Sequence, residues 1–167
     1  MNKIIIISGS NNKNLEVSRE FEKSFQKKGV QSEILDLVFL NLPLYSPDAE
    51  TRGIPEVIGS LKEKVDNSKG LVFVSPEYNG GIPPVVTNFI AWISRSGDKN
   101  WRDAFNGKVA ALASFSGSGG IQMLISLRAQ LSYIGLNVLG RQVRATYQKE
   151  LDLKDIDTVS EQLLKWV

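Results

Sequence analysis

The chain has 167 residues, 42% of them hydrophobic, and its formal net charge at pH 7 is +2. Such a length and apolar content are typical of one well-packed core, so we expect a single domain spanning residues 1–167. The basic residues are scattered and do not interleave with aromatic residues, which argues against a nucleic-acid partner. The apolar run within Met1–Ser8 is too short for a signal peptide or a membrane span, so we expect no membrane contact and a cytoplasmic protein.

The chain contains neither cysteine nor histidine. The missing cysteine excludes disulfides, thiolate nucleophiles and thiolate metal ligands. The missing histidine excludes an imidazole base, a Ser-His-Asp triad and imidazole metal ligands. Carboxylate, lysine or tyrosine chemistry remains, as does chemistry supplied by a bound cofactor. The cofactor interpretation agrees better with the rest of the sequence, and no catalytic side chain and no metal site are predicted.

The first half of the chain alternates between predicted strands and helices. A run of β-branched residues predicts a buried strand at Lys3–Ser8, and apolar residues four positions apart predict a helix over Asn14–Lys28. Alternating polar and apolar residues predict a second strand at Gln31–Asp36. A polar, proline-bearing loop over Phe39–Ile54 then leads to a helix over Pro55–Asn67, with proline in its first turn.

The second half continues the alternation. Three strands are expected at Gly70–Ser75, Lys108–Phe115 and Asn137–Arg144. Three helices are expected as well: one ending at Arg95, one following SGSGG with an apolar stripe, and one over Asp155–Val167. Because strands and helices alternate throughout, the sequence predicts an α/β protein whose parallel sheet is covered by helices on both faces.

Three loops are rich in glycine, asparagine and serine, and each follows a predicted strand. They read GSNNKN after the first strand, PEYNGGIPP after the third and SGSGG after the fourth. In a parallel sheet of this kind, ligands bind beyond the carboxyl ends of the strands. Residues of these types allow close backbone approach and offer hydrogen-bonding groups. The loops therefore predict a ligand held largely by backbone atoms.

The first loop opens onto the start of a helix, where unpaired N–H groups and the helix dipole favour an anion. We expect a phosphate there, coordinated by Gly9, Ser10, Asn11, Asn12 and Asn14. A polar turn with an asparagine cap accounts for the same residues equally well. The loop lacks the glycine spacing of a dinucleotide fingerprint or a Walker loop.

The segment LVFVSPEYNGGIPPVVTNFIAWISR resembles the signature of the NADPH-dependent FMN reductase family, a flavodoxin-like group. The nine matching positions are Pro76, Glu77, Tyr78, Asn79, Pro83, Asn88, Trp92, Ser94 and Arg95. The first loop, LPLYSPD and SGSGGIQMLISLRAQL resemble further parts of the family, so the resemblance covers nearly the whole chain. It implies a flavodoxin-like, doubly wound sheet of five parallel strands in the order 2-1-3-4-5.

The resemblance also implies a cofactor and a reaction. FMN would bind with its ring against the PEYN loop, which begins at Pro76, and against the SGSGG turn. The residues implied at its polar edge are Glu77, Tyr78, Asn79, Ser116, Gly117 and Gly119, mainly through backbone groups. NADPH or NADH would then donate hydride, and a quinone, azo compound, free flavin or metal oxyanion would accept electrons in a ping-pong cycle. An electron-carrying flavodoxin and a flavin-free module, such as a receiver domain, are the alternatives.

Two features lead to further expectations. Asn12 stands near the place of an arginine usual in the family, which predicts weaker phosphate binding and salt-sensitive FMN affinity. The helix within Pro83–Arg95 carries more apolar residues than one sheet contact needs, which predicts a subunit interface and, with the resemblance, a homodimer or homotetramer. Trp92 and Arg128 are expected to serve packing or subunit contacts.

Overall fold

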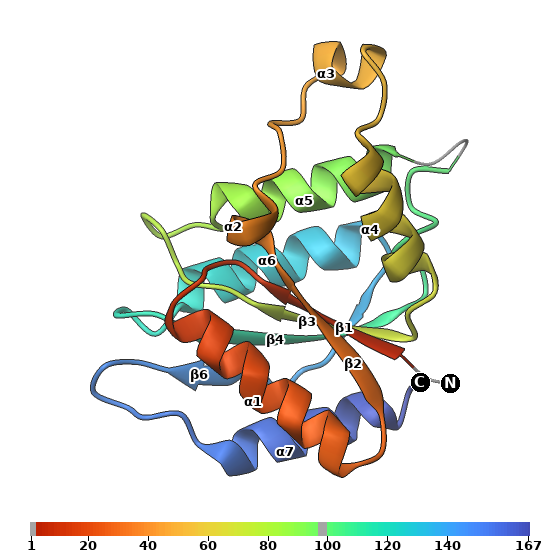
Figure 1. Cartoon of the computed structure of the whole chain (residues 1–167). Helices are drawn as coiled ribbons and strands as arrows, with labels where there is room; N and C mark the ends of the chain where they lie inside the picture. The colour runs from red at the N-terminus through yellow and green to blue at the C-terminus, as the bar shows by residue number, and fades with distance from the viewer. Residues whose placement is uncertain (1–2, 97–99) are drawn as a thin grey trace.

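A parallel β-sheet forms the centre of the protein in a computed structural model that describes residues 3–96 and 100–167 (Figure 1). The strands in this part of the chain are β1 Lys3–Ser8, β2 Gln31–Asp36, β3 Gly70–Val74, β4 Val109–Phe115, β5 Asn137–Val138 and β6 Val143–Ala145. They follow the order β2-β1-β3-β4-β5, and β6 also pairs with β4. The predicted flavodoxin-like order is therefore confirmed.

Helices cover both faces of this sheet, as Figure 1 shows. The helices are α1 Lys13–Lys27, α2 Leu37–Leu40, α3 Pro47–Thr51, α4 Glu56–Asp66, α5 Pro84–Arg95, α6 Ile121–Tyr133 and α7 Leu153–Leu164. Helices α1 and α7 pack on one face, and α4, α5 and α6 pack on the other. Within residues 3–96 and 100–167, no helix is both long and apolar enough to cross a membrane.

Strand β1 places apolar side chains on both faces of the sheet, so both faces must be covered by helices. Successive side chains of a strand point to opposite faces. Ile5 and Ile7 accordingly pack with α4, α5 and α6, whereas Ile4 and Ile6 pack with α1 and α7. All four isoleucines are at most 1% exposed, so the run of β-branched residues specifies a central strand.

The prediction of a fifth strand over Asn137–Arg144 was wrong in one respect. Instead of one strand over Asn137–Arg144 there are two short strands, β5 and β6, that pair with the two ends of β4. Gly140 lies in the break, and glycine weakens a strand interior. The guanidinium of Arg128 donates hydrogen bonds to the carbonyls of Val138 and Leu139, at 3.2 and 2.7 Å, and so holds the connection in place. The packing role expected of Arg128 is confirmed.

The predicted loop over Phe39–Ile54 also contains regular structure that the sequence analysis missed. Helix α3 begins after Ser46, whose hydroxyl accepts a hydrogen bond from the Ala49 N–H at 3.0 Å, and Pro47 occupies its first turn. Serine followed by proline is a readable start signal for a helix. Helix α7 begins at Leu153, two residues earlier than expected, because the Asp152 side chain accepts a hydrogen bond from the Lys154 N–H at 2.8 Å and caps the helix.

The apolar face of α5 does not point outward as the sequence analysis expected. Its residues Val86, Phe89, Ile90, Trp92 and Ile93 are all buried within the chain itself. Segment 43–45 folds back over the helix: the Trp92 Nε1–H donates to the Pro43 carbonyl at 2.7 Å, and the Tyr45 ring packs edge-on against Trp92. This burial removes the α5 argument for a subunit interface, while the packing role expected of Trp92 is confirmed.

Candidate functional site

Loops that follow β1, β3, β4 and β6 gather at the carboxyl edge of the sheet (Figure 1). They enclose a cavity of about 260 Å³. Its lining residues are Ser10, Asn12, Lys13, Asn14, Pro76, Glu77, Tyr78, Phe115, Ser116, Gly117 and Tyr147. The structure thus brings together the three loops that the sequence singled out.

The first loop is pressed against the sheet at Gly9. Its N–H donates to the Val74 carbonyl at 2.8 Å. A Cβ atom at this position would lie 2.8 Å from both Ser75 Oγ and Val86 Cγ2, so only glycine allows this approach. Ser10 is buried against the same edge, whereas Asn11 and Asn12 are exposed. Asn12 is the N-cap of α1 and its side chain makes no capping hydrogen bond.

Asn14 ties the start of α1 to strand β4. Its Oδ1 accepts a hydrogen bond from the Phe115 N–H at 2.8 Å, and its Nδ2 donates to the Phe115 carbonyl at 2.9 Å. The side chain is 2% exposed. Because both ends of the amide are engaged, Asn14 fixes the position of the helix start. The Leu15 N–H donates to the Asn12 carbonyl at 2.9 Å, so the backbone N–H groups of Lys13 and Asn14, together with Ser10, remain to meet an anion.

Lys13 is the first residue of α1, and its side chain is paired with Glu16 of the same helix. Lys13 Nζ lies 2.8 Å from Glu16 Oε2, and both side chains are exposed. The hydrogen bond and negative charge of Glu16 raise the pKa of Lys13 above its ordinary value. The lysine is therefore fully charged at neutral pH, but it is turned toward α1.

The second loop makes a tight two-residue turn at Asn79 and Gly80. Tyr78 and Gly81 exchange backbone hydrogen bonds of 3.1 and 2.9 Å on either side of it. Asn79 has φ 52° and Gly80 has φ 72°, which asparagine and glycine adopt readily. The turn presents the Tyr78 ring to solvent, with half of the side chain exposed.

The third loop, Ser116–Gly120, is held by hydrogen bonds within the loop and to β6. The Gly119 N–H donates to the Ser116 carbonyl at 2.9 Å, and the Ser116 N–H donates to the Ala145 carbonyl at 3.2 Å. Arg144 Nε donates to the Gly119 carbonyl at 3.0 Å and fixes the turn from the side.

Internal hydrogen bonds decide which backbone groups remain for a ligand. The N–H groups of Glu77, Tyr78, Ser116 and Gly119 all donate within the protein. Those of Asn79 and Gly117 have no acceptor in the part of the chain that the structure describes. Of the six residues predicted at the polar edge of the ring, Asn79 and Gly117 therefore keep an available N–H donor, and of these two Gly117 lines the cavity whereas Asn79 does not.

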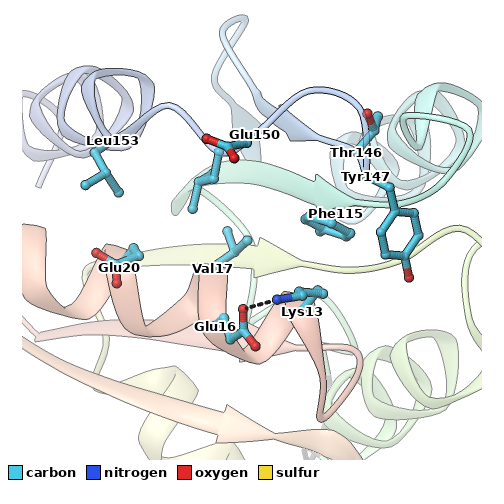
Figure 2. Close-up of a pocket in the computed structure, with 10 residues that line it drawn as sticks. Lys13, Glu16, Val17, Glu20, Phe115, Thr146, Tyr147, Glu150 and Leu153 are labelled. Atoms are coloured by element: carbon cyan, nitrogen blue, oxygen red, sulfur yellow. Dashed lines mark hydrogen bonds and ion pairs between the residues drawn. The ribbon is translucent and has the colours of Figure 1, made fainter.

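A second, larger cavity of about 510 Å³ adjoins the first and is shown in Figure 2. It lies between α1 and segment 146–153, and it shares Lys13, Phe115 and Tyr147 with the first cavity. The Tyr147 ring packs edge-on against Phe115 with 5.1 Å between ring centres. Tyr147 was not predicted from the sequence, although its loop also leaves the carboxyl edge of the sheet.

Comparisons with known proteins agree with this arrangement. The model of the NADPH-dependent FMN reductase family matches residues 2–150. The chain is 30% identical over 165 residues to an uncharacterized protein of Mycoplasma pneumoniae, covering 97% of this chain and 98% of that relative. It is 31% identical over 114 residues to an NADPH azoreductase of a Bacillus species, covering 68% of this chain and 60% of that enzyme.

A solved structure with the same fold is that of FerB, a flavoenzyme NAD(P)H:(acceptor) oxidoreductase from Paracoccus denitrificans. It superposes with a TM-score of 0.81 at 20% identity, covering 99% of this chain and 97% of FerB.

Proposed function

The chain belongs to the NADPH-dependent FMN reductase family, and from this premise we propose that residues 1–167 act as one FMN-binding domain that passes electrons from NADH or NADPH to a small acceptor. The observation that carries the proposal is the juxtaposition, at one edge of the sheet, of the start of helix α1 with the second and third loops, where the N–H groups of Asn79 and Gly117 have no acceptor among the described residues. FMN combines a phosphate with a flat ring that has a polar edge, and these two kinds of donor match its two ends.

The residues of the site fit FMN in their chemistry. The N–H groups at the start of α1 and the buried Ser10 would hold the phosphate, and the N–H groups of Asn79 and Gly117 would meet the polar edge of the ring. Gly117 has open space beside it, since a Cβ atom there would approach nothing closer than the Tyr147 ring at 3.9 Å. The full set proposed for the cofactor site is Gly9, Ser10, Asn11, Asn12, Asn14, Pro76, Glu77, Tyr78, Asn79, Ser116, Gly117 and Gly119.

The contribution of the protein to the reaction is position rather than proton transfer. FMN, when bound, supplies the hydride and electron chemistry. The chain offers no histidine, and the Glu77 carboxylate is already engaged by Ser118 and Met123. The loops therefore bind and orient the reacting molecules. The nicotinamide nucleotide and the acceptor would bind in turn at the same exposed face of the flavin ring, which corresponds to a ping-pong cycle.

The proposed acceptors are quinones, azo compounds, free flavins and metal oxyanions. The Bacillus relative is an NADPH azoreductase, which supports an azo compound among these acceptors. An electron-carrying flavodoxin is the second candidate, but such carriers are generally strongly acidic and this chain has a formal charge of +2. We place the reaction in the cytoplasm, where reduced nicotinamide nucleotides are used.

A direct experiment tests the proposal. The purified protein is titrated with FMN, and the loaded protein is mixed with NADH or NADPH in a stopped-flow spectrometer, first alone and then with a panel of acceptors. Bleaching of the flavin absorbance followed by recovery on adding an acceptor supports the reductase. A protein that binds FMN but oxidises neither nucleotide with any acceptor would be the carrier instead.

We also propose a homodimer or homotetramer, now on the evidence of a different surface. Helix α6 exposes Ile121, Ile125 and Tyr133 by 42%, 60% and 69%, and their four- and eight-residue spacing places them on one side of the helix. A stripe of this kind is typical of a contact surface. Light scattering tests the assembly, and a lone species of 18.5 kDa in dilute solution would contradict it.

A further inference from the structure

Helix α6 begins without a capping side chain of its own. Its N-cap is Gly120, which has φ 67°. A Cβ atom at Gly120 would lie 2.2 Å from Ser114 Oγ, so no residue with a side chain fits there without displacing the strand beneath. The first N–H groups of a helix nevertheless need acceptors. The acceptor must therefore come from elsewhere in the fold.

Glu77 of the PEYN loop supplies that acceptor. Its Oε2 accepts a hydrogen bond from the Met123 N–H at 3.0 Å, and its Oε1 accepts one from the Ser118 hydroxyl at 2.6 Å. A carboxylate at this end of a helix is also favoured by the helix dipole. The Ser118 hydroxyl and the Met123 N–H lower the pKa of Glu77 below its ordinary value, so the carboxylate is charged at neutral pH.

The same residue also binds the third loop through its backbone. The Glu77 N–H donates to Ser116 Oγ at 3.3 Å. Three hydrogen bonds thus join one residue of the second loop to Ser116, Ser118 and Met123. The N–H groups of Asn79 and Gly117, which have no acceptor in the part of the chain that the structure describes, lie within two residues of these contacts, and Gly117 lines the cavity.

We propose that the Glu77 side chain is a positioning residue that sets the spacing between the Asn79 and Gly117 N–H groups and so prepares the cavity for the flavin ring. This inference rests on the proposed FMN site. In this role the Glu77 carboxylate acts on the two loops and does not contact the reacting atoms. Without it, the loops would be ordered only when the ligand binds, and affinity would fall.

Two substitutions at Glu77 distinguish positioning from charge. Glutamine can offer its carbonyl oxygen to the Met123 N–H and its amide group to Ser118 Oγ, whereas alanine can offer neither. We expect Glu77→Ala to raise the FMN dissociation constant by about ten- to a hundredfold, since it removes two hydrogen bonds to a charged group. Glu77→Gln should stay within about threefold of the unmodified protein, because neutral hydrogen bonds replace charged ones.

Asp36→Ala is the matched control. The Asp36 carboxylate accepts hydrogen bonds from the N–H groups of Val38 and Phe39 at 3.0 and 3.2 Å, so it also caps a helix with two contacts. It stands on β2, at the far edge of the sheet from β6. We expect Asp36→Ala to lower the unfolding temperature and to leave FMN affinity unchanged.

Two measurements make up the test: FMN titration by calorimetry, and amide hydrogen exchange of the FMN-free proteins. In Glu77→Ala, exchange should accelerate at Met123 and across 116–120, with little change elsewhere. Equal FMN affinity in the unmodified protein and Glu77→Ala would overturn the inference and leave the proposed function intact. If the unmodified protein binds no FMN, the proposed function fails, and the positioning role toward the flavin fails with it. Unchanged exchange at Met123 would overturn the inference regardless of FMN.

Discussion

Replacing Glu16 by glutamine should tighten FMN binding, because it releases Lys13. The Lys13 ammonium stands in the first turn of α1, beside the N–H groups proposed to hold the phosphate, and pairs with Glu16 at 2.8 Å. A phosphate must either compete with the Glu16 carboxylate for this ammonium or bind without it. Removing the carboxylate also removes a negative charge that repels the phosphate.

The size of the effect follows from the exposure of the pair. The two side chains are 50% and 59% exposed, so their interaction is screened by solvent. Exposed ion pairs are weak, so releasing the lysine should lower the FMN dissociation constant by only about two- to fivefold. The helix should lose little stability, because an exposed pair three residues apart contributes little to it.

Calorimetric titration with FMN at low and high salt checks this prediction. Glu20→Gln is the control, since Glu20 pairs with Lys23 at 2.7 Å one turn further along α1. We expect Glu16→Gln to bind FMN more tightly at low salt, with the gain shrinking at high salt, and Glu20→Gln to bind like the unmodified protein. Equal tightening by both variants would show a general charge effect, and unchanged binding by Glu16→Gln would refute the competition for Lys13.

Three further predictions address the phosphate loop, the glycine turn and acid stability. Asn12→Arg removes no capping hydrogen bond, and a guanidinium on the phosphate should tighten FMN binding by about ten- to a hundredfold, measured by titration. Gly120→Ala should lower the free energy of unfolding by about 2 kcal/mol or more in urea, because of its φ of 67° and its contact with Ser114. The pKa of Glu77 is lower when folded, so its stabilisation is present above the ordinary value of 4.5 and is lost as pH falls through the lowered value. The stability difference between the unmodified protein and Glu77→Gln should therefore vanish in strong acid, as urea unfolding across pH would show.

Local patterns were sufficient to predict the sheet and most of its helices. The isoleucines of β1 and the glycine-rich ends of β1, β3 and β4 are features of short segments, so the strands and the edge that carries the cavity could be anticipated, whereas the strand order was implied by the family resemblance. Gly140 was a readable sign of the break between β5 and β6, and Ser46 with Pro47 was a readable start for α3. The break between the two strands and the start of α3 could therefore have been predicted from local residues.

Contacts between residues far apart in the sequence could not be predicted from local patterns. The apolar stripe of α5 seemed excessive because nothing local shows that segment 43–45 folds back onto Trp92. The Glu77 contacts join residues 41 and 46 positions apart, and the Asn14 contacts span 101 positions. Such pairings depend on how the loops meet after the sheet has formed, and the motif itself shows only that glutamate and asparagine are present.

A site built largely from backbone groups needs side chains of a particular kind. Backbone N–H groups can orient a flavin only if their loops are held still, and the loops after β1, β3 and β4 each have a polar side chain that holds them. Asn14 fixes the first loop to β4, Glu77 fixes the second loop to the third, and Arg144 fixes the third loop from β6. These residues resemble candidates for acid, base or ligand chemistry, yet each of the three makes hydrogen bonds that hold a loop within the protein. In a chain without histidine or cysteine, polar side chains at the site act on geometry, and substitutions there should change cofactor affinity before they change the chemical step.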